Sequence, residues 1–252
     1  MANQNWASDD YKTIGDYQYE LGGPVIELLA PKSGEKILDL GCGDGKLTKE
    51  VVDLGCDVIG IDANPEMVES AKALGIDARV KDAEHLHMDE RFDAVMSNAS
   101  LHWMADHYGV VRGIWHVLKP GGRFSAECGG EGCIRIIREG LKLALIKRGL
   151  DYKARNPWKY PELGTFSDIL ENQGFKINYI ARINRPTPLP KGLKSWLEVF
   201  AKSHTKGFSE EDKRSFYKDV EKYCRPLLYT EEKGWFADHV RLRILAEKPL
   251  KA

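Results

Sequence analysis

The sequence has no long apolar run, no surplus of charge of either sign, and no cysteine pairs at metal-binding spacing. A net charge of −1 gives no basic footprint of the kind that general nucleic-acid-binding proteins carry. No apolar stretch approaches the roughly 18–20 residues that a membrane-spanning helix needs. The first residues are polar and lack the apolar segment of a secretory signal. We therefore expect neither nucleic-acid nor membrane partners.

The number and spacing of the cysteines argue against both a disulfide framework and a metal site. The chain has five, an odd number that does not suit a framework of disulfides: Cys42, Cys56, Cys128, Cys133 and Cys224. Their spacing predicts no metal site. Reduced thiols are typical of proteins in a reducing compartment, so we expect a cytoplasmic protein.

The composition fits one folded domain of generous size. The chain has 252 residues, of which 42% are hydrophobic and 30% charged, and it can bury a sizeable core. Between residues 35 and 128 short apolar stretches alternate with helical patterns. The predicted strands are 36–40, 57–61, 77–80, 92–97 and 122–127, and the predicted helices are 45–54, 65–74 and 106–118. This alternation favours right-handed βαβ units on a parallel sheet.

The rhythm changes after residue 128. The patterns there predict helices over 131–150, 165–173, 192–203 and 209–226, and strands over 175–183 and 239–247. Residues 185–190 contain three prolines and predict a stiff linker. The last strand alternates apolar residues with Arg241 and Arg243. Such a half-polar strand fits an antiparallel position near a sheet edge.

A glycine-rich turn follows the first predicted strand, in the stretch Lys36-Ile37-Leu38-Asp39-Leu40-Gly41-Cys42-Gly43-Asp44-Gly45. Glycine has no Cβ and accepts positive φ, so a ligand can lie directly on the backbone of this turn. The first amides of the following helix point at the same place. Asp62 ends the next strand, where a carboxylate can accept hydrogen bonds from a ribose diol. The pattern predicts a cofactor that contains a nucleoside.

The turn does not suit a dinucleotide. Lys46 stands where a dinucleotide fingerprint has its third glycine, and the acidic Asp39 and Asp44 would repel a diphosphate. The same carboxylates favour a cofactor that carries positive charge. S-adenosylmethionine has a sulfonium and an ammonium group and no phosphate.

Five motifs occur in order over residues 35–128: residues 38–45, 60–63, 81–83, 92–98 and 118–122. In this order and spacing they resemble the class I S-adenosylmethionine-dependent methyltransferases. The first half of the chain is most similar to the small-molecule branch related to trans-aconitate methyltransferase. The similarity to that branch rests on Trp6 and Tyr11 near the start and on Ser100-Leu101-His102-Trp103 after the fourth strand.

The resemblance implies an α/β fold with a doubly wound, seven-stranded, mostly parallel Rossmann-like sheet and a helical lid inserted before the last strand. Residues 1–34 would then be a helical segment that covers the cofactor. Residues 35–185 and 236–252 would form the cofactor-binding core, and 186–235 the lid, within a single domain overall.

The resemblance also implies the cofactor contacts. Gly41, Cys42 and Gly43 would approach the methionine and ribose parts, and Asp62 would bind the ribose hydroxyls. The remaining implied contacts are Asp39 anchoring the turn, Ala63 and Met67 on the adenine ring, Asp82 and Ala83 at the adenine edge, Asn98 at the methionine moiety or the acceptor, and Tyr11 as a cover. The structural alternatives are a cap of the following turn for Asp39 and an inert small residue for Cys42.

His102 is the candidate catalytic residue. It follows the fourth strand, whose carboxyl end faces the ligand crevice in a doubly wound sheet, and a neutral imidazole there could act as a general base. The alternative is a structural histidine that hydrogen-bonds the backbone beside Trp103. Methyl transfer is an SN2 displacement, and a carboxylate acceptor would need no base. We expect the acceptor pocket to come from 129–165 and 186–235.

The leading functional interpretation is a methyltransferase that moves the sulfonium methyl of S-adenosylmethionine to a small molecule and releases S-adenosylhomocysteine. A carboxylate or hydroxyl oxygen is one acceptor, and nitrogen and carbon remain alternatives. A non-catalytic binder of S-adenosylmethionine and a nucleotide-dependent oxidoreductase are the other classes. Ser97-Asn98-Ala99-Ser100 lacks the Asn-Pro-Pro-Tyr-like pattern of nucleic-acid methyltransferases. The oligomeric state, monomer or homodimer, stays open.

Overall fold

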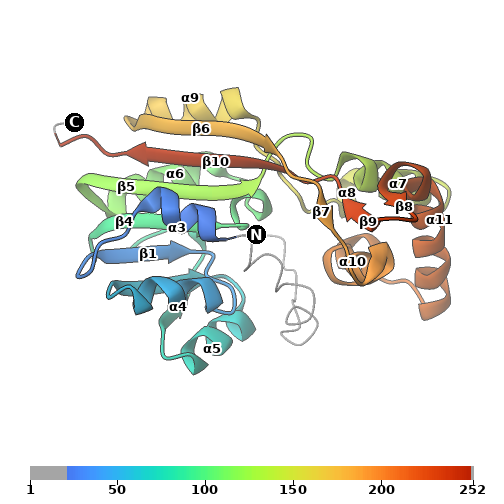
Figure 1. Cartoon of the computed structure of the whole chain (residues 1–252), viewed down its shortest axis with the longest axis horizontal. Coiled ribbons are helices and arrows are strands. Elements are labelled where there is room, and N and C mark those ends of the chain that lie inside the picture. The colour runs from blue at the N-terminus through green and yellow to red at the C-terminus, as the bar shows by residue number, and fades with distance from the viewer. Residues whose placement is uncertain (1–21, 251–252) are drawn as a thin grey trace.

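Seven strands form one sheet in the order β3-β2-β1-β4-β5-β10-β6 (Figure 1). The computed structural model describes residues 22–250. The strands of this sheet are β1 (Lys36–Leu40), β2 (Asp57–Asp62), β3 (Asp77–Val80), β4 (Phe92–Asn98), β5 (Leu118–Gly129), β6 (Lys176–Asn184) and β10 (Val240–Glu247). The first five strands are parallel, and β10 is antiparallel to both β5 and β6. The predicted doubly wound, mostly parallel sheet is therefore confirmed.

Helices cover both faces of the sheet (Figure 1). Apolar side chains of α3 (Gly23–Leu29) and α4 (Lys46–Asp53) share one core cluster with β1 and β4. On the other face α6 (His107–Val117) and α9 (Leu163–Gln173) bury a larger cluster against the sheet. The helix α5 (Pro65–Ala73) packs against β2 and β3. Among the helices of residues 22–250, none is long and apolar enough to cross a membrane.

Local signals set the helix ends close to the predicted positions. Asn64 caps α5 because its side chain accepts a hydrogen bond from the Glu66 amide, and Pro65 occupies the first turn. Asp106 caps α6 in the same way through the Gly109 amide. Gly174 ends α9 in the left-handed conformation.

A second group of helices lies beyond one end of the sheet (Figure 1). We call it the helical subdomain, and it has its own apolar cluster. It consists of α7 (Arg135–Ile146), α8 (Tyr152–Arg155), α10 (Gly192–Phe200), η3 (Lys202–Thr205), α11 (Glu210–Leu228) and a small sheet of β7 (Thr187–Pro188), β9 (Gly234–Ala237) and β8 (Tyr229–Thr230). The arrow of β1 points toward it, so the subdomain faces the carboxyl ends of the parallel strands (Figure 1).

The helical subdomain differs in composition from the segment that the sequence indicated. The predicted insertion, 186–235, supplies α10 and α11, but α7 also belongs here because Ile137 and Leu141 share a cluster with Phe216 and Val220. The sequence placed α7 within the core segment 35–185. Residues 187–188, predicted as part of a stiff linker, pair with β9 as a short strand.

The start of α7 is held by a residue from far along the chain. Asp238, two residues before β10, accepts a hydrogen bond from the Ile134 amide through its carbonyl at 2.9 Å. Its Oδ2 accepts a second from the Ile136 amide at 2.8 Å. Ile134 has a φ of 45°, which is unusual for a β-branched residue. The helical subdomain is thus tied to β10, the strand that lies between β5 and the edge strand β6.

Candidate functional site

The glycine turn lies between β1 and α4, and its three glycines all have positive φ: 79° at Gly41, 56° at Gly43 and 84° at Gly45. The amides of Gly41 and Cys42 both donate to the Ile61 carbonyl, at 2.8 Å and 3.0 Å. Gly41 has a packing reason to be glycine, since a Cβ there would lie 1.9 Å from Ser100 Oγ. The turn is therefore fixed against β2 on one side and against the segment after β4 on the other.

The space beside the Cα of Gly43 is empty, whereas the corresponding space at Gly41 is filled by Ser100. A Cβ on Gly43 would meet nothing within 4 Å. Its amide donates to Asp62 Oδ2 at 3.1 Å, which places the carboxylate at the tip of β2 beside the bare backbone of the turn. This combination of open glycine backbone and adjacent carboxylate fits a ligand with a ribose diol.

The carboxylate of Asp62 is held in one orientation. Its Oδ1 accepts a hydrogen bond from the Asn64 amide at 2.8 Å, and Oδ2 accepts the one from Gly43. Burial raises the pKa of Asp62, against the backbone hydrogen bonds that lower it. Two carboxylate oxygens offer about four acceptor positions. Capacity therefore remains for a hydroxyl donor on the partly exposed side.

Asp39 lies beneath the turn and not on its surface. The residue is only 2% exposed, and its Oδ2 accepts a hydrogen bond from Thr48 Oγ1 at 2.6 Å. Burial raises the pKa of Asp39 to about 7. The contact joins β1 to α4, so the geometry favours the anchoring role of Asp39 over direct contact with a ligand.

Cys42 directs its sulfur away from the turn surface. The residue packs in an apolar cluster with Val68, Ala71 and Ile76, and a Cβ on Gly60 would lie 2.9 Å from its Sγ. Burial raises the pKa of the Cys42 thiol well above its usual value. Only the backbone of Cys42 can face a ligand. The five cysteines are free and buried.

The residues predicted for the adenine ring follow β2 and β3 at the same edge of the sheet. The Lys81 amide donates to the Asp62 carbonyl at 3.0 Å, which brings Asp82 close to the tip of β2. Asp82 caps the short helix η1 (Ala83–His85), since its Oδ1 accepts from the Glu84 amide at 2.9 Å. Ala83 and Met67 are buried and Ala63 is partly exposed. Tyr11 lies outside the described residues.

The end of β4 carries strained backbone. Asn98 lies near α3, since a Cβ on Gly22 would be 3.1 Å from its Nδ2. Ala99 follows with a φ of 53°, and its amide donates to the Glu127 carbonyl at 2.7 Å. A non-glycine residue with positive φ at a strand end beside the crevice is typical of a functional site.

His102 is buried in η2 (Leu101–Trp103), and its geometry does not suit a general base. Its Nδ1 accepts a hydrogen bond from the Gly129 amide at 3.2 Å, so the proton of the neutral ring must lie on Nε2. Burial lowers the pKa of His102 to about 3. A ring in this state donates from Nε2. The contacts show the ring bonded to the backbone, as in the structural alternative, and leave its proton on Nε2 as a hydrogen-bond donor.

Aromatic rings lead from His102 into the helical subdomain. The ring of Tyr160 stacks on His102 with a centroid separation of 5.5 Å and an angle of 18°. Trp103 lies 5.9 Å from Trp158, which in turn lies 6.3 Å from Trp196. Tyr160, Trp158 and Trp196 come from the two segments predicted to form the acceptor pocket, 129–165 and 186–235, and Trp103 lies beside His102 in η2.

A cluster of charged residues at the same end of the sheet was missed from the sequence. Glu127 near the end of β5 is 2% exposed, and Arg185 and Arg243 both pair with it. Arg241 is 4% exposed nearby. The alternation of the two arginines in the last strand was the available signal, but exposure to solvent would produce the same pattern.

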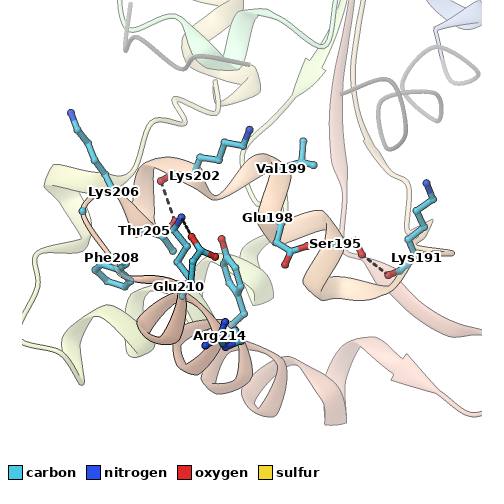
Figure 2. Close-up of a pocket in the computed structure, with 13 residues that line it drawn as sticks. Lys191, Ser195, Glu198, Val199, Lys202, Thr205, Lys206, Phe208, Glu210 and Arg214 are labelled. Carbon is cyan, nitrogen blue, oxygen red and sulfur yellow. Dashed lines mark hydrogen bonds and ion pairs between the residues drawn. The ribbon is translucent and has the colours of Figure 1, made fainter. Parts of the chain in front are cut away.

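A separate surface pocket of about 670 Å³ lies on the helical subdomain between α10, η3 and α11 (Figure 2). Its walls include Lys202, Glu210 and Arg214, and all of its lining residues fall within 191–217. None of them belongs to the glycine turn or to a strand end, so this pocket does not join the site described above. Within residues 22–250 no group of three or more potential metal ligands occurs.

Comparisons with known proteins identify the family. A family model described as a methyltransferase domain matches residues 38–126, the part that runs from β1 into β5. An uncharacterised methyltransferase of Schizosaccharomyces pombe is 34% identical over 98% of this chain and 100% of its own. The chain therefore belongs to the methyltransferase family, and the predicted resemblance to the S-adenosylmethionine-dependent class is confirmed.

More specific similarity is confined to part of the chain. A trans-aconitate 2-methyltransferase of Rhodococcus jostii is 32% identical over 48% of this chain and 52% of its own. Among solved structures, a putative methyltransferase from Bacillus halodurans superposes with a TM-score of 0.64 over 90% of this chain and 98% of its own, at 16% identity. That likeness concerns the fold.

Proposed function

We propose that this protein transfers the methyl group of S-adenosylmethionine to a small-molecule acceptor and releases S-adenosylhomocysteine. The observation that carries the proposal is the open backbone of Gly43 hydrogen-bonded to Asp62 at the tip of β2. Bound S-adenosylmethionine would supply an electrophilic methyl group on its sulfonium. The residues of the chain would bind the cofactor, orient the acceptor toward the methyl group and shield both from water.

The cofactor contacts follow the strand ends. Asp62 would accept hydrogen bonds from the ribose hydroxyls, and Gly41 and Gly43 would let the ribose and methionine parts lie on the backbone. Asp39 and Cys42 would support that turn from below. The adenine and methionine ends complete the set: Ala63 and Met67 against the ring, Asp82 and Ala83 at its edge, Asn98 toward the methionine moiety, and Tyr11 as a cover.

The charge around the turn supports a cationic cofactor over a dinucleotide. Asp62 and Asp82 stand at neighbouring strand ends, and Asp44 lies in the turn itself. Lys46 lies 3.3 Å from Asp44, so the basic residue at the turn is paired with an acid. A diphosphate would meet these carboxylates at close range, whereas a sulfonium and an ammonium would be attracted to them.

Catalysis would come from positioning the acceptor against the methyl group and from excluding water around both. An SN2 methyl transfer needs the acceptor atom in line with the breaking S–CH₃ bond, and holding two reactants in this way lowers the entropic part of the barrier. The rings of Tyr160, Trp158 and Trp103, which contact one another beside His102, would exclude water from the acceptor. His102 would orient the acceptor by donating from Nε2, without taking a proton from it.

Calorimetric titration tests the cofactor. We expect micromolar binding of S-adenosylmethionine and S-adenosylhomocysteine and no binding of reduced nicotinamide cofactors. Release of S-adenosylhomocysteine in the presence of small carboxylates, phenols or amines then tests transfer and separates oxygen from nitrogen acceptors. Binding without turnover for any acceptor would favour a non-catalytic binder, and binding of reduced nicotinamide cofactors would overturn the proposal.

A further inference from the structure

One buried carboxylate serves two guanidinium groups at the end of β5. Glu127 is 2% exposed, and its two oxygens are both taken. Oε1 accepts from Arg185, and Oε2 accepts from Arg243 at 2.7 Å. The carboxylate therefore has no oxygen that is free of an arginine, and these three residues together already carry a positive charge.

Arg241 adds a third guanidinium at the same place. In the register of β10 with β5, Arg243 lies opposite Glu127 and Arg241 lies opposite Gly129. Directly paired residues share a face of the sheet, so Arg241 is on the face of the Glu127 cluster, closer to the carboxyl end of β5. It is 4% exposed.

Arg241 lacks a counter-charge among residues 22–250. Its buried Nε makes no hydrogen bond there, and the nearby Glu127 pairs with Arg185 and Arg243 instead. Its positive charge contributes, after burial, to the low pKa values of His102 and His239, so these two rings are neutral and offer it no counter-charge. Asp238, three residues earlier, directs its Oδ2 to the start of α7.

A buried charge without a counter-charge is destabilising, because desolvation is not offset by an ion pair. Such a residue is explained when a ligand supplies the missing charge. We propose that Arg241 binds an anionic oxygen group of the methyl acceptor, a carboxylate or a phosphate, and selects acceptors that carry one. This inference rests on the proposed methyltransferase function.

The position of Arg241 suits the acceptor and not the cofactor. Strands in a sheet are about 5 Å apart, so β10 lies about 10 Å from β4 and about 15 Å from β1 and its glycine turn. Tyr160 and His102, which stack on each other, both lie within range of the Arg241 charge. A guanidinium also presents a planar fork that matches the two oxygens of a carboxylate or phosphate.

The anchored group is not the one that receives the methyl. Hydrogen bonds from Arg241 occupy the lone pairs of the bound oxygens and reduce their nucleophilicity. Methylation there would also leave a neutral ester beside a buried cation. The acceptor therefore carries at least two functional groups, an anion held by Arg241 and a separate nucleophile presented to the sulfonium.

The test uses the full chain with and without saturating S-adenosylhomocysteine, titrated calorimetrically with benzoate, phenyl phosphate and the neutral benzamide. The variants are Arg241→Met and, as a control, Arg182→Met, which removes the same charge from an exposed position on β6. Arg241→Lys keeps the charge without the fork and serves if the methionine variant does not fold. Thermal unfolding of each variant accompanies the titrations.

We expect one anion to bind the wild-type chain and benzamide not to bind. The Arg241→Met variant should bind that anion about 10- to 150-fold more weakly, as expected when hydrogen bonds to a charged group are lost. The affinity of Arg241→Met for S-adenosylhomocysteine should be unchanged. Arg182→Met should bind both the anion and S-adenosylhomocysteine as the wild-type chain does. Which of benzoate and phenyl phosphate binds decides between a carboxylate and a phosphate.

Three results would overturn the inference. The first is equal binding of benzamide and the anions, and the second is equal binding of the anions to wild type and Arg241→Met. The third is weaker binding of S-adenosylhomocysteine by Arg241→Met, which would assign Arg241 to the cofactor. If the wild-type chain bound an anion through Arg241 but no S-adenosylhomocysteine, the methyltransferase proposal would fail while the anion site remained.

Discussion

The backbone amide of Gly43 donates a hydrogen bond to Oδ2 of Asp62 at 3.1 Å. The bond joins the glycine turn after β1 to the tip of β2, so the two parts of the proposed cofactor site are held at a fixed separation. A change at either residue should therefore alter the site at both, and substitutions here are the most direct test of the proposed function.

Replacing Asp62 by alanine should weaken S-adenosylhomocysteine binding by about 1.5–3 kcal/mol, the range for a hydrogen bond that involves a charged group. Asp57→Ala is the matched control, because Asp57 is an exposed aspartate at the opposite end of the same strand. Calorimetric titration of both variants measures the difference. Equal affinity in Asp62→Ala and wild type would refute the ribose assignment.

Replacing Gly43 by alanine should impair cofactor binding far more than stability. The φ of 56° at Gly43 makes alanine unfavourable by about 1–2 kcal/mol, and the new methyl group would enter the space proposed for the cofactor. Gly75→Ala carries the same kind of strain at φ 80°, also with no atoms near its Cβ, but it lies after α5 and outside the turn. Urea unfolding should give similar losses for both variants, and only Gly43→Ala should lose affinity for S-adenosylhomocysteine.

The free energy of unfolding should decrease as the pH rises from about 4 to 7, in part because of Asp39. Its pKa is 3.8 ordinarily and about 7 in the folded protein, where burial favours the neutral acid. Between these values the unfolded chain binds fewer protons than the folded chain, so stability falls as pH rises, by an amount on the order of 4 kcal/mol.

Asp39→Asn should remove that decline, because the amide oxygen can still accept the hydrogen bond from Thr48 and cannot ionise. Urea unfolding of both proteins at pH 5 and pH 8 measures the effect. The variant should be the more stable protein at pH 8. Parallel pH dependence in the two proteins would contradict a raised pKa at Asp39.

His102 should not appear in the pH dependence of turnover. Because its pKa is about 3, the ring is neutral throughout the range from pH 5 to 8, and Nδ1 is occupied by the Gly129 amide. His102→Ala should lower kcat with an acceptor found by screening, through loss of the Nε2 donor, and leave cofactor affinity unchanged. An inflection near pH 6.5 that disappears in His102→Ala would instead establish a general base.

The parts of the fold set by local signals were predictable. The bounds of α5 follow from Asn64, Pro65 and Gly75, which lie within or next to the helix they define. The grouping of α7 with α11 was not predictable, because an apolar helix face does not specify which surface it covers. The two-residue strands of the small sheet are too short to produce a periodic pattern.

The charged cluster was missed for a similar reason. The alternation of Arg241 and Arg243 correctly predicted an antiparallel strand, but it is the same whether the polar face meets water or a buried acid. Arg243 pairs with Glu127, 116 residues earlier in the chain, and no local pattern carries that information. The glycine turn and Asp62 were found because their motif lies within one βαβ unit.

The hydrogen bonds between Asp238 and the start of α7 have a consequence for folding during synthesis, because they join residues that are far apart in the chain. The ribosome releases β1 to β5 early, and these strands pair with near neighbours in the chain. The amide of Ile136 can form its hydrogen bond only after another 102 residues have been synthesised and the side chain of Asp238 is present. The strand that follows, β10, must then enter between β5 and β6. In a nascent chain the pairing of β1 to β5 therefore precedes both the docking of β10 and the attachment of α7 to Asp238.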